Sequence, residues 1–214
     1  MPVYNQALSD YITRTYAQGD PTLESIRHQI VARGLPGVSI RPEEGRFLQF
    51  LVAACGARLA LEIGTLGGYS GVWITRGLGN AGRLISIERN PRHAEIAREH
   101  FDQAGVSDQV EVRVGEALQL LPQVAGEGPF DFLFIDAEKV DYPAYLDWTM
   151  ENLRPGGIIT AHNAFRRGRI VNQEESNPGL DAVRIFNQRL AENPRFIATI
   201  YPAGDGISVA VLTE

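Results

Sequence analysis

The sequence has little of several things that would place it in a special class. Its single cysteine, Cys55, cannot form a disulfide within the chain. The N-terminal segment lacks the apolar run of a signal peptide, and no stretch approaches the roughly 18 apolar residues of a membrane-spanning helix. Basic residues are not in excess, since 20 lysines and arginines face 26 acidic residues for a net charge of −6. We therefore expect a cytoplasmic protein whose partners are neither nucleic acids nor membranes.

Lysine is almost absent. Arginine supplies 19 of the 20 basic residues, and Lys139 is the only lysine. An arginine side chain stays charged in proteins, whereas the amine of a lysine can lose its proton. Lys139 is therefore a candidate for proton transfer.

The pattern of apolar residues predicts an α/β fold. Beyond residue 57, five short apolar runs alternate with amphipathic segments at a spacing of about 25 residues, which is typical of βα units. These runs cover residues 58–64, 83–88, 110–115, 130–137 and 157–162. Two further strands, Phe196–Tyr201 and Ile207–Leu212, are joined by a linker too short for a crossover and so form an antiparallel hairpin. We expect a Rossmann-like, doubly wound, seven-stranded sheet that is mostly parallel, with the hairpin at its C-terminal end.

The chain divides into an extension and one compact domain. Residues 1–57 are predicted to be a helical extension that includes a helix over Pro42–Ala54, and residues 58–214 form the domain. Asn90-Pro91 is predicted to begin a helix, and residues 152–157 are predicted to end another and turn into a strand.

A glycine-rich loop, LEIGTLGGYSG over residues 61–71, follows the first strand. It is not a Walker loop, because the chain contains no Gly-Lys pair, and Gly64-Thr65-Leu66 breaks the Gly-x-Gly spacing of the dinucleotide fingerprint. Glu88 ends the second strand, where a carboxylate can accept hydrogen bonds from ribose hydroxyls. The loop with Glu88 resembles motifs I and II of class I S-adenosylmethionine-dependent methyltransferases. An NAD-dependent oxidoreductase is the alternative, which fits the sheet and Glu88 but not the glycine spacing.

Four segments in order, residues 42–48, 61–70, 134–139 and 204–206, resemble the catechol and caffeoyl-CoA type O-methyltransferases. The resemblance implies S-adenosylmethionine as cofactor, a homodimer, and a methyltransferase domain over residues 58–214. The positions expected to bind the donor are Glu62, Gly64, Gly68, Tyr69, Ser70, Glu88, Gly115, Glu116, Ala117, Asp136 and Tyr145. Glu116 departs mildly from the family, which more often has aspartate there.

The resemblance also implies catalytic residues. In the family an Asp after strand four and an Asp-Asn pair after strand five hold a divalent cation, and a Lys three residues after the first Asp acts as base. Asp136 and Lys139 match the first part, but His162-Asn163 stands in place of Asp-Asn. A nitrogen ligand weakens the case for magnesium and favours manganese, iron or zinc at Asp136, His162 and Asn163. A metal-free enzyme in which His162 and Lys139 handle the phenol proton is equally consistent, so both versions stay open.

The acceptor is expected to be a small aromatic with a hydroxyl group, such as a catechol or a phenylpropanoid. Three arginines, Arg166, Arg167 and Arg169, suggest that it carries a carboxylate, a phosphate or a coenzyme A tail. The alternative is a solvated basic loop balanced by Glu174 and Glu175. The other three histidines, His28, His93 and His100, are predicted to lie on the surface. A protein that binds the donor without methylating anything is also left open.

Overall fold

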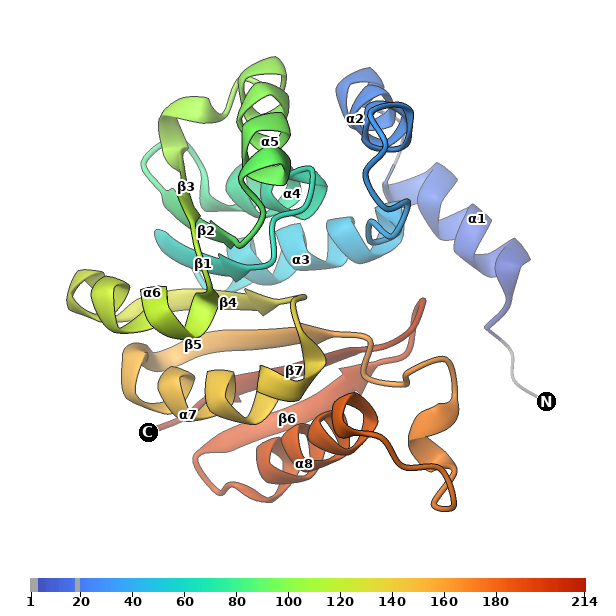
Figure 1. Ribbon diagram of the computed structural model, residues 1–214, viewed down its shortest axis with the longest axis vertical. Helices are drawn as coiled ribbons and strands as arrows, with labels where there is room; N and C mark the ends of the chain where they lie inside the picture. Colours follow the sequence, from blue (N-terminus) through green and yellow to red (C-terminus); the bar gives the residue numbers. More distant parts are fainter. Residues whose placement is uncertain (1–3, 18–19) are drawn as a thin grey trace.

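The computed structural model describes residues 4–17 and 20–214. Within these residues seven strands form one sheet in the order β3-β2-β1-β4-β5-β7-β6 (Figure 1). Six strands run in one direction, and β7 runs antiparallel to both of its neighbours. The strands are β1 Leu59–Ile63, β2 Arg83–Glu88, β3 Val110–Val114, β4 Phe130–Ile135, β5 Leu153–His162, β6 Phe196–Tyr201 and β7 Ile207–Leu212. The predicted fold class is confirmed.

The helices begin where the sequence signals a start. In α5 the side chain of Asn90 accepts a hydrogen bond from the N–H of Arg92, and Pro91 takes the first helical position. The helix predicted over Pro42–Ala54 is α3. The α-helices of the described residues are α1 Gln6–Tyr16, α2 Pro21–Ala32, α3 Pro42–Ala54, α4 Tyr69–Leu78, α5 Pro91–Gln103, α6 Ala117–Val124, α7 Tyr142–Asn152 and α8 Pro178–Glu192.

Helices cover both faces of the sheet, and this explains why the strands read as continuous apolar runs. Alternate strand residues such as Leu84 and Phe132 pack with α2, α3, α4 and α5 in one apolar cluster. Their neighbours Ile85 and Leu133 belong to a second cluster with α6, α7 and α8. Burial of both faces is the main source of stability, because each fully buried aliphatic or aromatic side chain contributes about 1.5 to 3 kcal/mol.

The structure differs from the sequence expectation at residues 152–157. These residues do not form a turn before strand five, because β5 already begins at Leu153, which pairs with Phe130. The pairing register shifts between Phe130 and Phe132, and Gly156 has a φ of +75°. An irregularity in a paired strand, with glycine in a left-handed conformation, therefore replaces the expected turn.

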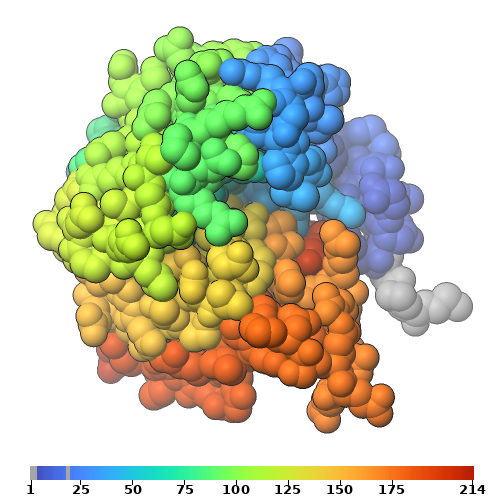
Figure 2. Space-filling model, viewed as in Figure 1, coloured from blue at the N-terminus to red at the C-terminus, as the bar shows by residue number. Residues whose placement is uncertain are grey.

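The parallel strands and the start of α3 meet at a cavity of about 1060 Å³. The cavity lies beyond the carboxyl ends of β1, β2, β4 and β5, where ligands bind in open α/β sheets. Figure 2 shows a hollow on this face, among the N-terminal, green and orange parts of the surface. Among the described residues no helix is long and apolar enough to cross a membrane.

Candidate functional site

The cavity brings together most of the residues that the sequence predicted for the site. Those that line it are Gly64, Tyr69, Ser70, Glu88, Gly115, Glu116, Ala117, Asp136, Tyr145, His162 and Asn163. Glu62, Gly68 and Lys139 do not line it. Glu62 and Lys139 nevertheless adjoin the cavity, because Glu62 accepts from Ser70 and Lys139 donates to Asp136, and both of these partners line it.

The glycine loop between β1 and α4 needs glycine for two different reasons. Gly64 has a φ of +100°, and a β-carbon there would lie 2.2 Å from the carbonyl oxygen of Asp136. Gly68 has a φ of +78°, and a β-carbon there would lie 2.9 Å from the ring of Phe101. Gly64 therefore lets the ends of β1 and β4 approach each other, whereas Gly68 lets α4 begin against α5.

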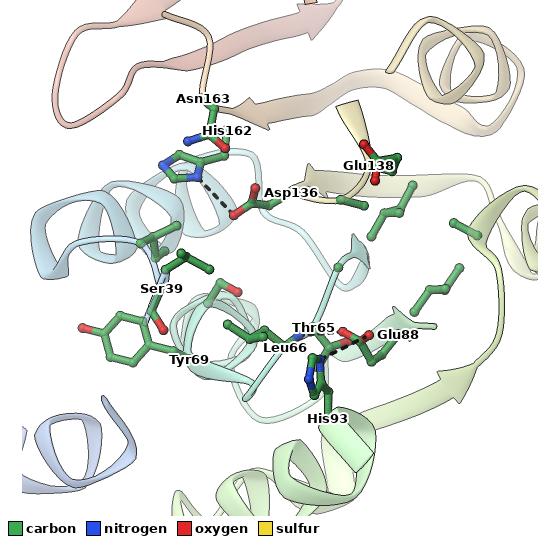
Figure 3. Close-up of a pocket in the computed structure, with 18 of the residues that line it drawn as sticks. Ser39, Thr65, Leu66, Tyr69, Glu88, His93, Asp136, Glu138, His162 and Asn163 are labelled. Carbon is green, nitrogen blue, oxygen red and sulfur yellow. Dashed lines mark hydrogen bonds and ion pairs between the residues drawn. The ribbon is translucent and has the colours of Figure 1, made fainter. Parts of the chain in front are cut away.

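Glu88 is held in place at the end of β2. The N–H of Leu66 donates to its Oε2 at 2.8 Å, and the N–H of Asn90 donates to its Oε1 at 2.9 Å. The Nδ1 atom of His93 lies 3.8 Å from Oε1, so this ring also borders the cavity (Figure 3). His93 was predicted to be a surface residue, and its side chain is partly exposed as well as bordering the cavity. Its place in the first turn of α5, directly after Glu88, is the signal that the sequence analysis passed over.

Glu62 lies one layer behind the donor side of the cavity. Its side chain is fully buried and accepts hydrogen bonds from the hydroxyl groups of Ser70 and Ser86. Burial raises the pKa of Glu62 to about 7, against the effect of these two hydrogen bonds. Its contact with the cavity is therefore made through Ser70, which does line it.

His100 was also predicted to lie on the surface, and that prediction is wrong. It is buried, and its Nδ1 atom lies 2.8 Å from the carbonyl oxygen of Gly67. The ring faces inward because His100 precedes the buried Phe101 on the side of α5 that packs against α4. The bond to Gly67 compensates for the burial of Nδ1, whereas the buried Nε2 has no hydrogen-bond partner among the described residues.

Lys139 points at Asp136 rather than into the cavity. Its ammonium group donates to Oδ1 of Asp136 at 2.9 Å and to the hydroxyl of Tyr142 at 2.7 Å. Burial opposes the charge, but Tyr142 and Asp136 hold the pKa of Lys139 above its usual range. Burial would also raise the pKa of Asp136, but Lys139 and His162 hold it well below its usual range. Lys139 is thus protonated in the resting site.

His162 lies between two carboxylates. Its Nδ1 atom is 3.0 Å from Oδ2 of Asp136, and its Nε2 atom is 3.1 Å from Oε1 of Glu44 (Figure 3 shows the first contact). Burial opposes the charged ring, but Asp136 and Glu44 raise the pKa of His162 to about 10. Glu44 is a site residue that the sequence analysis missed, since an acidic residue in the first turn of a helix is ordinarily read as a cap.

The predicted metal ligands do not fit a divalent cation in this arrangement. Each ring nitrogen of His162 faces a carboxylate oxygen and must carry a proton, so neither has a lone pair for a metal. Each oxygen of Asp136 already faces a cation, since Oδ2 contacts His162 and Oδ1 accepts from Lys139, and these two positive charges would repel a divalent cation bound at this carboxylate. The amide nitrogen of Asn163 donates to Asp205 at 3.1 Å. Within residues 4–17 and 20–214 no group of three or more His, Cys, Asp and Glu side chains is placed to hold a metal ion.

The arginines of the loop after β5 fit both alternatives in part, a binding site for an anionic acceptor and a solvated basic loop. Arg169 lines the cavity, but it forms an ion pair with Glu175, as expected of a solvated basic loop. Arg166 and Arg167 line the cavity, and neither forms an ion pair with any residue that the structure describes. Positive charge at this edge of the cavity is therefore not balanced by nearby carboxylates in ion-pair contact.

Comparisons with known proteins agree with one another. Residues 13–212 match a protein family described as O-methyltransferase. The chain is 37% identical to a catechol O-methyltransferase of Niastella koreensis, with 97% of each chain covered. It is 40% identical to a catechol O-methyltransferase of Mycobacterium tuberculosis, with 94% of this chain and 93% of that protein covered. An O-methyltransferase from Bacillus cereus, solved in complex with SAH, superposes with a TM-score of 0.91 at 40% identity, with 97% of each chain covered.

Proposed function

The chain belongs to the O-methyltransferase family, as its motifs predicted, and on that premise we propose that it transfers the methyl group of S-adenosylmethionine to a hydroxyl of a small aromatic acceptor. The observation that carries the proposal is one cavity with two differently built ends. Glu88 and the glycine loop lie at one end, and Asp136, His162 and Asn163 lie at the other (Figure 3).

The first end suits the donor. Each oxygen of Glu88 accepts a backbone hydrogen bond and keeps a second lone-pair direction, with which it accepts from a ribose hydroxyl. We assign the adenine to Gly115, Glu116 and Ala117, which follow β3 at the cavity wall. We assign the methionine part to Gly64, Tyr69 and Ser70, with Glu62 and Gly68 shaping the loop from behind and Tyr145 also lining the cavity.

The second end suits a hydroxyl that must lose its proton. Methyl transfer forms an oxygen–carbon bond, breaks a sulfur–carbon bond and releases the hydroxyl proton, so the enzyme mainly aligns the reactants and favours the phenolate. The charged Lys139 and His162 stabilise the developing negative charge. Lys139 can accept the proton only as a neutral amine, and its raised pKa makes that form scarce at neutral pH. We therefore expect turnover to increase as the pH rises above neutral.

Arg166 and Arg167 favour an acceptor that carries an anionic group. Both border the cavity without an ion-pair partner among the described residues, and a guanidinium binds carboxylate or phosphate through paired N–H groups. A phenolic acid fits both features, with its hydroxyl near His162 and its carboxylate near the arginines.

The test is a purified-protein assay that measures S-adenosylhomocysteine formation with a panel of phenols. We expect turnover with ortho-dihydroxylated aromatics, and higher apparent affinity for those that carry a carboxylate. Calorimetry should show binding of S-adenosylhomocysteine and no heat with NAD. Donor binding without turnover on any phenol would support a binding protein, and tight NAD binding would support an oxidoreductase.

We also propose a homodimer and a cytoplasmic location. The N-terminal extension leaves Val31, Val38 and Phe50 at least 60% exposed, more apolar surface than a covering layer needs. Light scattering that reports a monomer at micromolar concentration would contradict the dimer. The cytoplasmic location rests on the composition alone, through the lone cysteine.

A further inference from the structure

The charges at positions 136 and 162 show why a histidine changes the requirements of this site. An aspartate at position 162 would give, together with Asp136, two negative charges that a divalent cation neutralises. His162 with both ring nitrogens protonated carries one positive charge, and Asp136 carries one negative charge. The pair is therefore neutral without any added ion.

Glu44 is the third member of this group, and it comes from the N-terminal extension, 118 residues away from His162 in the sequence. Its side chain is only 2% exposed. One oxygen accepts from the N–H of Arg41 at the start of α3, and the other faces Nε2 of His162. A buried carboxylate that lacks a cationic partner is costly, so Glu44 and a charged His162 require each other.

The surroundings fix Glu44 in this position. A β-carbon at Gly204 would lie 2.1 Å from Oε1 of Glu44, so only glycine lets the loop between β6 and β7 close over the carboxylate. With Glu44 held from this side and Asp136 from the other, the ring of His162 cannot turn without losing a hydrogen bond.

Building on the proposed methyl transfer, we infer that the bridge Glu44–His162–Asp136 takes the place of a bound divalent cation. His162 supplies the fixed positive charge on the cavity wall at the acceptor end. Glu44 is a positioning residue that holds this ring charged and correctly oriented. Methyl transfer by this chain then needs no divalent metal.

Metal binding tests the inference without any need for activity. Mn²⁺ is titrated into the purified protein, and the free ion is followed by electron paramagnetic resonance. We expect the wild type to leave Mn²⁺ free and His162→Asp to bind it, because three carboxylates then meet at this point. Stoichiometric Mn²⁺ binding by the wild type that is lost in Asp136→Asn would overturn the inference.

The protonation of His162 tests the role of Glu44. Nitrogen NMR at neutral pH should show protons on both ring nitrogens in the wild type, because each nitrogen faces a carboxylate oxygen. In Glu44→Gln only Asp136 still faces the ring as a carboxylate, so a smaller fraction of the rings should carry both protons. Glu43→Gln is the matched control, because Glu43 is equally buried but accepts from Ser9 and Thr13 instead. A neutral ring in the wild type, or equal spectra in both variants, would contradict the role of Glu44.

The two proposals fail in different ways. If no phenol supports S-adenosylhomocysteine formation, the proposed function fails, whereas the Mn²⁺ and NMR results still decide whether the bridge exists. If turnover is found, it should be unchanged by a chelator and should fall at least about tenfold in Glu44→Gln, the loss typical of a weakened electrostatic contact. Turnover that a chelator abolishes and Mn²⁺ restores would overturn the inference.

Discussion

The donor end and the acceptor end of the cavity are built by different means. At the donor end, Glu62, the glycine loop and Glu88 lie within residues 61–88, and backbone N–H groups hold the key carboxylate; Gly115–Ala117 and Tyr145 add to it from later in the chain. At the acceptor end, Glu44, Asp136 and His162 come from distant parts of the chain, and charged side chains hold one another. The ribose and methionine part of the donor end is therefore mostly a local motif, whereas the acceptor end exists only when the tertiary structure is complete.

The two ends also differ in charge. Glu62 and Glu88 accept hydrogen bonds from hydroxyl and backbone groups, without a buried cation beside them. Asp136 and Glu44 are matched by Lys139 and His162. The positive sulfonium group of the donor would thus lie near carboxylates that no buried cation neutralises among the described residues. The acceptor oxygen, which becomes negative, would lie near carboxylates and cations in equal number.

We expect Asp136→Asn to have the largest effect on the protein, because this residue lies where the donor end and the acceptor end meet. The change leaves Lys139 and His162 as buried cations without their shared carboxylate. We expect the free energy of unfolding to fall by about 3 kcal/mol, the lower end of the range for a broken buried ion pair, and turnover to be lost. Urea unfolding measures the first effect. Glu138→Gln is the control, because that exposed cavity residue has a distant ion pair with Arg89, and a glutamine can still accept from the N–H of Lys139 as Glu138 does. Equal losses in both variants would refute the network.

Lys139→Ala should damage the acceptor end alone. We expect turnover to fall at least about a hundredfold, as for a lost acid–base group, with donor affinity nearly unchanged. Lys139→Arg should not restore it, since a guanidinium keeps the charge but cannot accept a proton. Steady-state kinetics and calorimetry measure the two quantities. Full activity in Lys139→Arg would show that only the charge next to Asp136 matters.

Glu88→Ala should weaken binding at the donor end and leave the acceptor end unchanged. Charge-assisted hydrogen bonds contribute about 1.5 to 3 kcal/mol each, so affinity for S-adenosylhomocysteine should fall at least about tenfold. Calorimetry measures this, and Glu111→Gln on the exposed part of β3 should bind normally. Unchanged affinity in Glu88→Ala would remove the assignment of the ribose to this residue.

The free energy of unfolding, measured over a series of pH values, should show the contribution of the charged His162 at the acceptor end. The pKa of His162 is about 10 in the folded chain and 6.5 in an unfolded one. Its contribution to stability is therefore complete below pH 6.5 and is lost as the pH rises through about 10. Urea unfolding should show stability declining over this window more steeply in the wild type than in His162→Gln. Parallel curves would mean that the ring is not charged in the folded protein.

The smallest effect is expected at the rim of the acceptor end. Arg166→Gln should raise KM about fivefold for a phenolic acid, because a partly exposed ion pair contributes at most ~1 kcal/mol. KM for an uncharged catechol should not change. Equal effects on both acceptors would indicate a general disturbance of the loop instead.

The sequence predicted the sheet well because its signals are local. The strands Arg83–Glu88, Phe196–Tyr201 and Ile207–Leu212 and the helix Pro42–Ala54 were predicted with the bounds that the structure has. Burial on both faces makes central strands such as β1 and β4 continuous apolar runs, whereas the edge strand β3 alternates apolar and charged residues, and proline marks several helix starts. The exception is the start of β5, where Pro155 and Gly156 signal a turn but the pairing of Leu153 with Phe130 extends the strand.

The site was predictable only in part, for a related reason. The glycine loop and Glu88 can be read along the chain, since their spacing reflects one strand-to-helix turn and the end of the next strand. Glu44, His93 and His100 acquire their surroundings from packing between elements. No sequence pattern connects Glu44 with His162, which lies 118 residues later. The sequence analysis therefore considered His162 as a metal ligand or a base and did not predict its contact with Glu44.

The hydrogen bond between Glu44 and His162 has a consequence for how this chain can vary. A boundary at residue 57 follows the strand pattern, yet it separates Glu44 from the ring that it holds. In a chimera that joined residues 1–57 of a relative without this glutamate to residues 58–214 of this chain, His162 would keep its contact with Asp136 but lose the partner of its Nε2 atom. The residues at positions 44 and 162 therefore have to match, and recombination between relatives must keep or exchange both of them together.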